Sequence, residues 1–299
     1  MIRRARSLVA APRLLARSLA ATRYAARAGA PGTDFAAFGR SLGLRALALG
    51  DRSALELLET PVSIVRYWEF PFVLRHLPQP AGRCLDISSP RLFAFYVASR
   101  RQPAELRMLN PDRRDAAISR RLASRFGFHN ILVEPRPVSA IRGSDQRYDS
   151  IWSISVIEHI PEDGDIDAMQ LMYAALAPGG ALMVTVPVDR RTWDEYRPED
   201  VYGLGIASNA DGRFFQRWYD ESTIVRRLLD PLGPVDVQVE WFGERVAGRF
   251  ADYENDWRRR GRERTVDDPR EIADWYASYG EWGEMPGQGV CGIVVRRPV

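Results

Sequence analysis

The stretch that decides the fold is Tyr148–Val188, YDSIWSISVIEHIPEDGDIDAMQLMYAALAPGGALMVTVPV. Residues 148–156 are rich in Ile, Trp and Ser and lack Gly and Pro, which predicts a mostly buried strand. A helix is indicated by apolar residues at i, i+3, i+4 and i+7, namely Met169, Met172, Tyr173 and Leu176. The PGG at 178–180 ends that helix, and 181–187 has the length of a second strand. A strand, a crossover helix and a strand predict a parallel sheet.

Charged and titratable residues follow the first of these strands. Asp163–Asp167 places negative charge at the helix start, where the helix dipole favours it. Glu158-His159 lies at the carboxyl end of the strand, where open α/β sheets bind ligands. His159 is our candidate catalytic base or substrate contact, because histidine titrates near neutral pH. The alternative is a loop histidine that bonds only to backbone groups.

The same stretch resembles the second half of a class I S-adenosylmethionine-dependent methyltransferase domain. In that family a strand beginning with (F/Y)D precedes an EH loop, a helix, and L-x-PGG-x-(L/F); here these are Tyr148-Asp149, Glu158-His159 and Leu176–Leu182. The resemblance implies an α/β fold: a Rossmann-like doubly wound sheet, mostly parallel, with an antiparallel last strand. It also implies S-adenosylmethionine as cofactor and places Ser155 and Glu158 in the cofactor site.

The family's first motif is altered in this chain. Arg83–Ile87 resembles the first sheet strand, which in the family runs into G-x-G-x-G, but those three places hold Ser88, Pro90 and Leu92. Serine as N-cap and proline as first helical residue still start a helix. The resemblance makes Asp86 a cofactor-site residue. The hydroxyls of Ser88 and Ser89 are candidates to bind the methionine carboxylate.

Two further cofactor positions depart from the family pattern. The acid that holds the ribose hydroxyls in the family follows the second strand, here Ala104–Leu109, and Asn110 occupies its place. An amide can bond one hydroxyl but lacks a carboxylate's charge. The acid that reaches the adenine follows the third strand, Ile131–Glu134, and the equivalent place near Val138 holds no acid.

Composition excludes several classes of protein. The chain has no lysine among its 42 basic residues, so it has neither a Schiff-base lysine nor a P-loop lysine. The three histidines and two cysteines are scattered, which gives no expectation of a metal site or disulfide framework. Cys84 lies in an apolar strand pattern and is expected to be a buried hydrophobe.

The N-terminal 32 residues form a basic extension. Residues 1–33 contain seven arginines and no acid, and subtracting these from the net charge of +3 leaves −4 for the rest of the chain. We therefore expect no nucleic-acid partner. On a helix, Leu8, Leu15 and Leu19 share a face opposite to arginines. Three interpretations stay open: a packed or frayed helix, peripheral membrane contact through residues 1–30, and an organellar presequence.

The remaining chain is expected to form one methyltransferase-like domain over 33–299. Its parts are a helical lid at 33–81, a core sheet at 83–244, an insertion at 245–285 and a last strand at 289–296. Residues 189–212 are expected to be mostly polar loop. Ser53 and Glu56 predict a capping box. Tyr67, Trp68 and Phe70 suit either a lid over the cofactor or core packing, and we favour packing.

These features support three functional hypotheses. The first is methyl transfer from S-adenosylmethionine to a small-molecule, sugar or lipid-linked acceptor, in a cytoplasmic protein that contacts the inner membrane face peripherally. The second is a non-catalytic binding or scaffold protein on the same fold, motivated by the lost glycines. The third, a nicotinamide dehydrogenase, fits worse because it needs those glycines and leaves the EH loop and PGG turn unexplained. The sequence does not define the oligomeric state.

Overall fold

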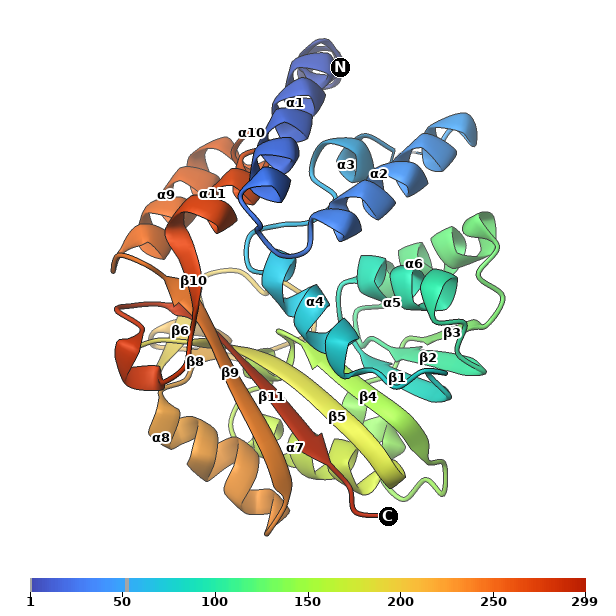
Figure 1. Ribbon diagram of the computed structural model, residues 1–299, viewed down its shortest axis with the longest axis vertical. Coiled ribbons are helices and arrows are strands. Elements are labelled where there is room, and N and C mark those ends of the chain that lie inside the picture. The colour runs from blue at the N-terminus through green and yellow to red at the C-terminus, as the bar shows by residue number, and fades with distance from the viewer. Residues whose placement is uncertain (1, 52–53) are drawn as a thin grey trace.

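The computed structural model describes residues 2–51 and 54–299, with side chains from Ala11 onward in the first helix. Its centre is an eight-stranded sheet in the order β10-β9-β11-β5-β4-β1-β2-β3 (Figure 1). β11 pairs antiparallel with β5 and β9, and the five strands from β5 to β3 are parallel. The sheet strands are β1 (Arg83–Ile87), β2 (Glu105–Leu109), β3 (Ile131–Glu134), β4 (Tyr148–Ile154), β5 (Leu176–Val188), β9 (Asp236–Glu244), β10 (Tyr276–Tyr279) and β11 (Gly289–Arg296).

Helices cover both faces of the sheet. One core joins the sheet to α2 (Thr33–Ala48), α4 (Arg66–His76), α5 (Arg91–Arg100) and α6 (Arg113–Phe126). The second core, on the other face, contains η1 (Val138–Ile141), α7 (Gly164–Ala174), α8 (Glu221–Ile224) and the following turn η3 (Val225–Leu229). The outer elements are α1 (Ile2–Arg27), α3 (Ala54–Glu59), η2 (Ile157–His159), η4 (Asp230–Leu232), α9 (Arg249–Arg260), α10 (Arg262–Thr265), α11 (Asp268–Trp275) and η5 (Trp282–Glu284).

Strand alternation explains the two cores. Leu106 and Met108 on β2 belong to the core beneath α5 and α6, and Leu109 belongs to the opposite one. Side chains of period two must point to opposite faces, and here both faces are apolar because both are covered by helices. The prediction of a Rossmann-like, mostly parallel sheet with an antiparallel last strand is confirmed.

The deciding stretch forms β4, α7 and β5 as expected, with one difference. α7 ends at Ala174, and β5 begins at Leu176, earlier than the expected start after the PGG turn. The pairing of β5 with β4 shifts register between Tyr148 and Ser150, so the turn residues are absorbed as an irregularity of the strand. Gly180 fits there because a Cβ would lie 3.0 Å from the carbonyl oxygen of Tyr148. β5 thus begins to pair with β4 before the apolar run at 181–187 starts.

The expectation of a mostly polar loop at 189–212 holds for most of these residues but misses the short strands within them. This region contributes to a separate three-stranded antiparallel sheet in the order β6-β8-β7, made of β6 (Trp193–Arg197), β7 (Ser208–Asn209) and β8 (Gly212–Trp218). β8 buries Phe214 and Trp218, whereas β6 and β7 are half-buried or exposed and mostly polar. Polar strands of this kind have no hydrophobic alternation for sequence reading to detect.

The N-terminal helix packs on the body. Its buried side chains are Leu14, Ser18, Ala21 and Ala25, and it contacts α11, α3 and α2. Thr33–Ala81 supplies α2, α3 and α4, and Tyr67, Trp68 and Phe70 are buried, which confirms the packing interpretation. The capping box at Ser53 lies outside the described residues. None of the helices in the described part of the chain combines the length and apolar character that a membrane span requires.

Candidate functional site

A cavity of about 290 Å³ lies at the carboxyl ends of β1 and β4. Its floor is the loop after β1, from Ser88 to Leu92, together with Ile154 and Ser155 at the end of β4. Arg66 of α4 and Tyr202, from the loop after β6, line the same space. Ligands bind at such strand ends in open α/β sheets, so this is the candidate active site.

The loop after β1 keeps the left-handed turn that the family builds with glycine. Ser88 has φ +53°, a conformation that L-residues adopt at a cost. Its backbone N–H and its hydroxyl both donate to the carbonyl of Leu109, at 2.8 and 2.9 Å. Two bonds to one acceptor hold the strained turn closed. The Ser88 hydroxyl is therefore already used within the protein and does not point its proton at the cavity.

Ser89 and Asp86 brace this loop from below. The N–H of Ser89 donates to Asp86 Oδ1 at 2.9 Å, and the N–H of Ile154 donates to the Ser89 hydroxyl at 3.0 Å. Both side chains are buried, and burial raises the pKa of Asp86 to about 6. Asp86 and Ser89 thus shape the cofactor loop and tie β1 to β4. Asp86 Oδ2 has no hydrogen-bond partner among the described residues, but Asp86 does not line the cavity.

Asn110 is also engaged within the protein. Its amide accepts from the N–H of Asp112 and donates to Asp115 Oδ2, each at 2.9 Å. Asp115 in turn pairs with Arg91 on α5, and both Arg91 and Asp115 line the cavity. Asp112 caps α6 through the N–H groups of Arg114 and Asp115. The carboxylate nearest to the family's ribose-binding place is consequently Asp115, which sequence reading did not identify.

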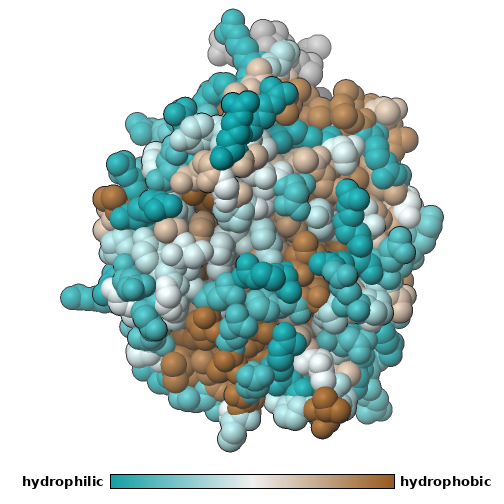
Figure 2. Space-filling model, in the orientation of Figure 1, coloured by the Kyte–Doolittle hydropathy of each residue, from teal (hydrophilic) through white to brown (hydrophobic). Residues whose placement is uncertain are grey.

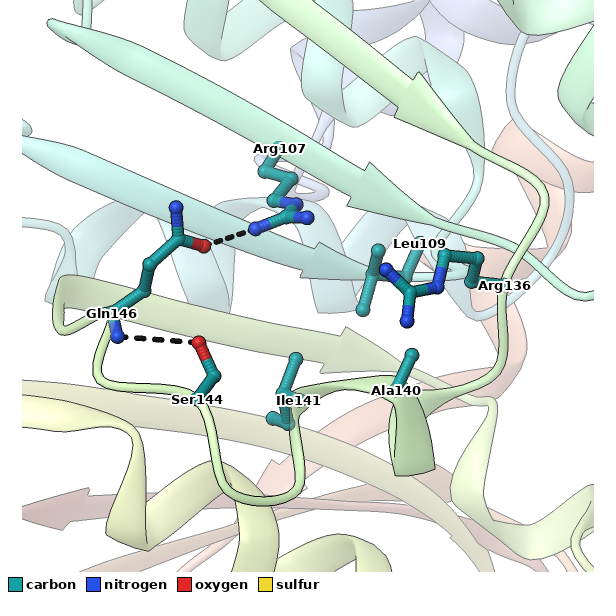
Figure 3. Close-up of a pocket in the computed structure, with 7 residues that line it drawn as sticks. All are labelled: Arg107, Leu109, Arg136, Ala140, Ile141, Ser144 and Gln146. Atoms are coloured by element: carbon teal, nitrogen blue, oxygen red, sulfur yellow. Dashed lines mark hydrogen bonds between the residues drawn. The ribbon is translucent and has the colours of Figure 1, made fainter.

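A second cavity, of about 350 Å³, lies beside β2 under the loop that leads to β4 (Figure 3). Arg107 and Gln146 face each other across it and are hydrogen bonded. Leu109 lines this cavity and Ser88 lines the first, so the Ser88–Leu109 contact stands between the two. Ala140 and Ile141 of η1 line it near the place of the family's adenine acid. Arg107 and Arg136 pair with Glu134, which keeps that carboxylate away from the cavity's lining.

A buried carboxylate of α4 organises the other side of the first cavity. Glu69 is fully buried and its Oε1 accepts from the hydroxyls of Ser155, at 2.5 Å, and Thr185, at 2.7 Å. Its Oε2 pairs with Arg66, one turn earlier on the same helix. Ser155 has φ +47° and is held in that conformation by these bonds and by its N–H donation to Thr185. α4, β4 and β5 are thus joined at the strand ends.

Glu158 is the most perturbed acid at the site. It is 1 % exposed, and its Oε2 has no hydrogen-bond partner among the described residues. Burial raises the pKa of the Glu158 carboxyl to about 8, against the opposing charge of Arg66. A carboxyl of this kind is largely protonated at neutral pH and changes charge close to it. Buried acids with such shifts gather at functional sites.

His159 and Tyr202 form a hydrogen-bonded pair. His159 Nδ1 lies 2.6 Å from the carbonyl oxygen of Phe215, and Nε2 lies 3.1 Å from the Tyr202 hydroxyl. A carbonyl only accepts, so Nδ1 carries the proton and Nε2 accepts from Tyr202. Burial lowers the pKa of His159 to about 4. The imidazole is therefore neutral at pH 7 and a weak base, which suits it to orienting Tyr202 more than to removing protons.

An ion-pair network fixes β8, the strand whose Phe215 carbonyl is hydrogen bonded to His159. Asp165 at the start of α7 is fully buried and pairs with Arg217 of β8 at 3.1 Å and Arg227 at 2.7 Å. The Tyr219 hydroxyl donates to the same carboxylate at 2.8 Å. Phe215 lies two residues before Arg217, so the network sets the carbonyl that receives the His159 proton. The acids predicted at the helix start act mainly through Asp165.

Of the residues expected from sequence, Ser88, Ser89 and Ser155 line the first cavity. Glu158 and His159 do not line it and lie behind it: His159 bonds to Tyr202, and Glu158 lies near the charge of Arg66. Asp86 lies under the cavity's floor and Asn110 at its far edge. Arg66, Glu69, Thr185, Asp115 and Tyr202 were not identified. An i, i+3 Arg–Glu pair inside an apolar helix, as at Arg66 and Glu69, was the one available signal. Nothing local to Tyr202 marks it, because a polar loop brings it there.

The α5 end of the site is suited to a ligand that carries a carboxylate and an apolar chain. α5 begins at Arg91 with Pro90 as its N-cap, so the expected serine N-cap with proline as first helical residue is not formed. No side chain caps this helix, and Pro90, Arg91 and Leu92 line the cavity, so a carboxylate is favoured at this end. Apolar walls come from Leu92 and Ile154. The methionine part of S-adenosylmethionine fits this set of groups, whereas the ribose lacks a free acid at Asn110. Within the described residues, no group of three His, Cys, Asp or Glu side chains is placed to hold a metal ion.

Comparison with solved structures agrees with this architecture. Phosphoethanolamine N-methyltransferase 2 from Haemonchus contortus has a TM-score of 0.50 and 13% identity, over 78% of this chain and 53% of that chain. NodS, an N-methyltransferase from Bradyrhizobium japonicum, gives 0.46 and 13%, over 87% and 100%. A methyltransferase from Mesorhizobium loti gives 0.47 and 15%, over 77% and 97%. No protein-family model and no curated protein matches the sequence. The chain has the class I methyltransferase fold.

Proposed function

We propose that this protein transfers the methyl group of S-adenosylmethionine to a small-molecule, sugar or lipid-linked acceptor. The observation that carries the proposal is the cavity at the ends of β1 and β4, which is bounded by the Ser88 turn and by Arg66 and Tyr202. The class I fold supports it, because its parallel strands end at this cavity. The antiparallel β11 between β5 and β9 distinguishes the sheet from the all-parallel order of a dinucleotide-binding fold.

The cofactor would be held mainly through backbone and apolar contacts. The uncapped first turn of α5 would receive the methionine carboxylate, and Leu92 and Ile154 would pack against the chain. The adenosine end would lie toward Leu109 and the second cavity. A bound sulfonium supplies an already activated methyl group, so the protein's task is alignment of an in-line attack.

The acceptor would be positioned by the two polar groups that line the cavity opposite the loop. Arg66, paired with Glu69, offers guanidinium N–H donors. The Tyr202 hydroxyl is oriented by His159, and burial raises the pKa of Tyr202 to about 12, so it stays protonated at neutral pH. Tyr202 would contact the acceptor, and His159 would act as a positioning residue through it.

A thermal-unfolding measurement tests this function. With S-adenosylmethionine or S-adenosylhomocysteine at about 1 mM, 100-fold above a dissociation constant of about 10 µM, linkage stabilises the protein by about 2.7 kcal/mol. For a chain of this size the unfolding temperature then rises by roughly 4 °C. NAD⁺ at the same concentration is expected to give no rise. A rise with NAD⁺ alone would support the dehydrogenase instead.

The second candidate is a non-catalytic binding protein on the same fold. Its support is the internal use of Ser88, Ser89 and Asn110, which leaves three expected cofactor contacts already bonded. The thermal measurement separates the two functions, because this candidate predicts no rise with any of the three ligands. We favour the methyltransferase because the bonds that close the Ser88 turn leave the uncapped first turn of α5 beside the cavity for backbone contacts.

A further inference from the structure

Three exposed leucines form an apolar patch at the end of α2. Leu44, Leu47 and Leu49 are 61, 58 and 49 % exposed, and we call them the α2 leucine patch. Figure 2 shows hydrophobic surface over the end of α2, with hydrophilic surface beside it. Leu44 and Leu47 are three residues apart on one helix face, and Leu49 follows directly after the helix. A single exposed leucine is ordinary, but a contiguous group indicates contact with another surface.

Arginines surround this patch. Arg121 and Arg125 of α6 reach across to Asp51, just beyond the patch, and Arg125 also donates to the carbonyl of Leu49. Arg45, between the leucines, lies over the Phe126 ring. The guanidinium side chains of Arg121 and Arg125 remain 44 and 43 % exposed, whereas Asp51 is buried. The surface around the leucines is therefore basic.

The N-terminal helix adds charge near the same end of the molecule (Figure 1). Its buried apolar side chains include Leu14, Ala21 and Ala25, whereas Leu15 and Leu19 of the predicted apolar face are half-buried, so little of the described apolar surface of this helix is exposed. Arg13, Arg23 and Arg27 are exposed on its outer side. Membrane contact through residues 1–30, one of the three interpretations that the sequence left open, would then be mainly electrostatic, and α2 would supply the apolar part of the contact.

We propose that the α2 leucine patch and its arginines dock on an anionic phospholipid bilayer. Basic side chains favour a negatively charged lipid surface, and the leucines can enter the boundary between headgroups and acyl chains. A second copy of the chain is a poorer occupant, because three leucines fall far short of the roughly 800 Å² that each partner buries in a stable dimer. The positive rim would also repel its own copy.

The patch adjoins the candidate active site. α3 packs closely against α2: a Cβ on Gly43 would lie 2.9 Å from Leu58 Cγ. The same short helix contributes Leu57 to the cavity's wall. α6, which carries the arginines, contributes Leu122 to the same wall. Docking would bring the cavity close to the bilayer. Resting on the proposed function, this favours a lipid-borne acceptor over a freely soluble one.

Co-sedimentation with vesicles tests the docking without requiring activity. We expect the full chain to bind phosphatidylcholine vesicles that contain about 30 % phosphatidylglycerol at least tenfold more strongly than pure phosphatidylcholine vesicles. The variant L44Q/L47Q/L49Q keeps good helix formers and should lose at least tenfold of that binding. The control L132Q/V246Q removes one leucine and one valine that lie outside the patch and are 50 and 59 % exposed. This variant should bind vesicles as the wild type does. Salt at about 0.5 M should weaken binding by screening.

Two results would overturn the proposal. One is an absence of binding to anionic vesicles, or binding that the triple leucine variant leaves unchanged while its unfolding temperature matches the wild type. The other is a wild-type dimer in sedimentation velocity that the triple variant converts to monomer, which would assign the patch to self-association. Neither result depends on methyl transfer, so failure here is distinguishable from failure of the proposed function.

Discussion

The Tyr202 hydroxyl lies 3.1 Å from Nε2 of His159 and joins the loop after β6 to the loop after β4. In this hydrogen bond Tyr202 donates and His159 accepts, because the Phe215 carbonyl fixes the imidazole proton on Nδ1. A side chain from a polar, poorly patterned segment is thereby oriented into the cavity at the strand ends. The pair connects Tyr148–Val188, the stretch that resembles the methyltransferase family, with the polar loop that carries Tyr202.

Tyr202→Phe is expected to slow methyl transfer and leave cofactor binding unchanged. The substitution removes the hydroxyl but keeps the ring, which packs against Phe215 with centroids 6.0 Å apart. A lost acceptor contact of this type costs roughly 100-fold in kcat. Single-turnover kinetics and a cofactor titration measure the two effects separately. An equal loss of cofactor affinity would show that Tyr202 belongs to the cofactor site.

The protonation of Glu158 makes stability depend on pH. Its folded pKa of about 8 exceeds the unfolded value, so the folded state binds more protons between pH 4.5 and 8. This group's contribution to stability is full below pH 4.5 and is lost as the pH rises toward 8. Glu158→Gln imitates the protonated form without titrating. The unfolding temperature of Glu158→Gln minus that of the wild type should therefore increase as the pH rises from 5 to 8. A difference that stays constant would contradict the assignment.

A cationic ligand beside Glu158 should release a proton when it binds. A nearby positive charge lowers the pKa of a carboxyl, so S-adenosylmethionine would ionise a group that is mostly protonated at pH 7. Calorimetry in two buffers of different ionisation enthalpy reports the proton. We expect release of a fraction of one proton by the wild type and none by Glu158→Gln. Equal release by both proteins would place the proton on another group.

The Ser88 turn can be tested by two substitutions. At φ +53°, Ser88→Gly gains about 1 kcal/mol of conformational energy and loses a hydrogen bond of similar value, so stability should change little. Ser88→Val places a β-branched side chain in the same conformation and loses the bond. We expect it to destabilise the protein by about 2–3 kcal/mol in urea unfolding. Similar stability of the two variants would mean that the turn is not left-handed.

Asp165→Asn tests the network that positions Phe215 and His159. Asp165 is fully buried between Arg217 and Arg227, and removing its charge leaves two guanidinium groups without their common partner. The expected cost is about 3–5 kcal/mol of unfolding free energy. The matched control is Asp163→Asn, which also contacts Arg227 but is 80 % exposed and should cost at most about 1 kcal/mol. Equal effects would mean that the buried network is not an anchor.

The scaffold was predictable because its signals are local and strong. β4, α7 and β5 follow from apolar runs separated by charge and by PGG, and β1 and α5 follow from RCLDI and the Ser-Pro helix start. Asp149, near the start of β4, accepts from the N–H of Arg83 at 2.7 Å and so ties β4 to β1. Each of these strands and helices depends on neighbours a few residues away, which is the range over which periodicity and capping are readable.

The site was only partly predictable because its key contacts span the chain. Glu69 meets Ser155 and Thr185 across 86 and 116 residues, and no spacing rule connects them. The family pattern assigned Ser88 and Asn110 to ligand contacts. In the structure the Ser88 hydroxyl is hydrogen bonded to the Leu109 carbonyl, and the Asn110 amide is hydrogen bonded to Asp115. Whether a hydroxyl is free depends on which acceptor the fold brings to it, and that information is not local.

Isothermal titration of the full chain with S-adenosylmethionine tests the central claim most directly. We predict one binding site per chain with a dissociation constant between about 1 µM and 1 mM, the range usual for enzyme substrates. S-adenosylhomocysteine should compete for the same site, and NAD⁺ should not. Absence of heat with both sulfur ligands at millimolar concentration, from a protein shown to be folded, would contradict the account and leave a methyltransferase fold without its cofactor.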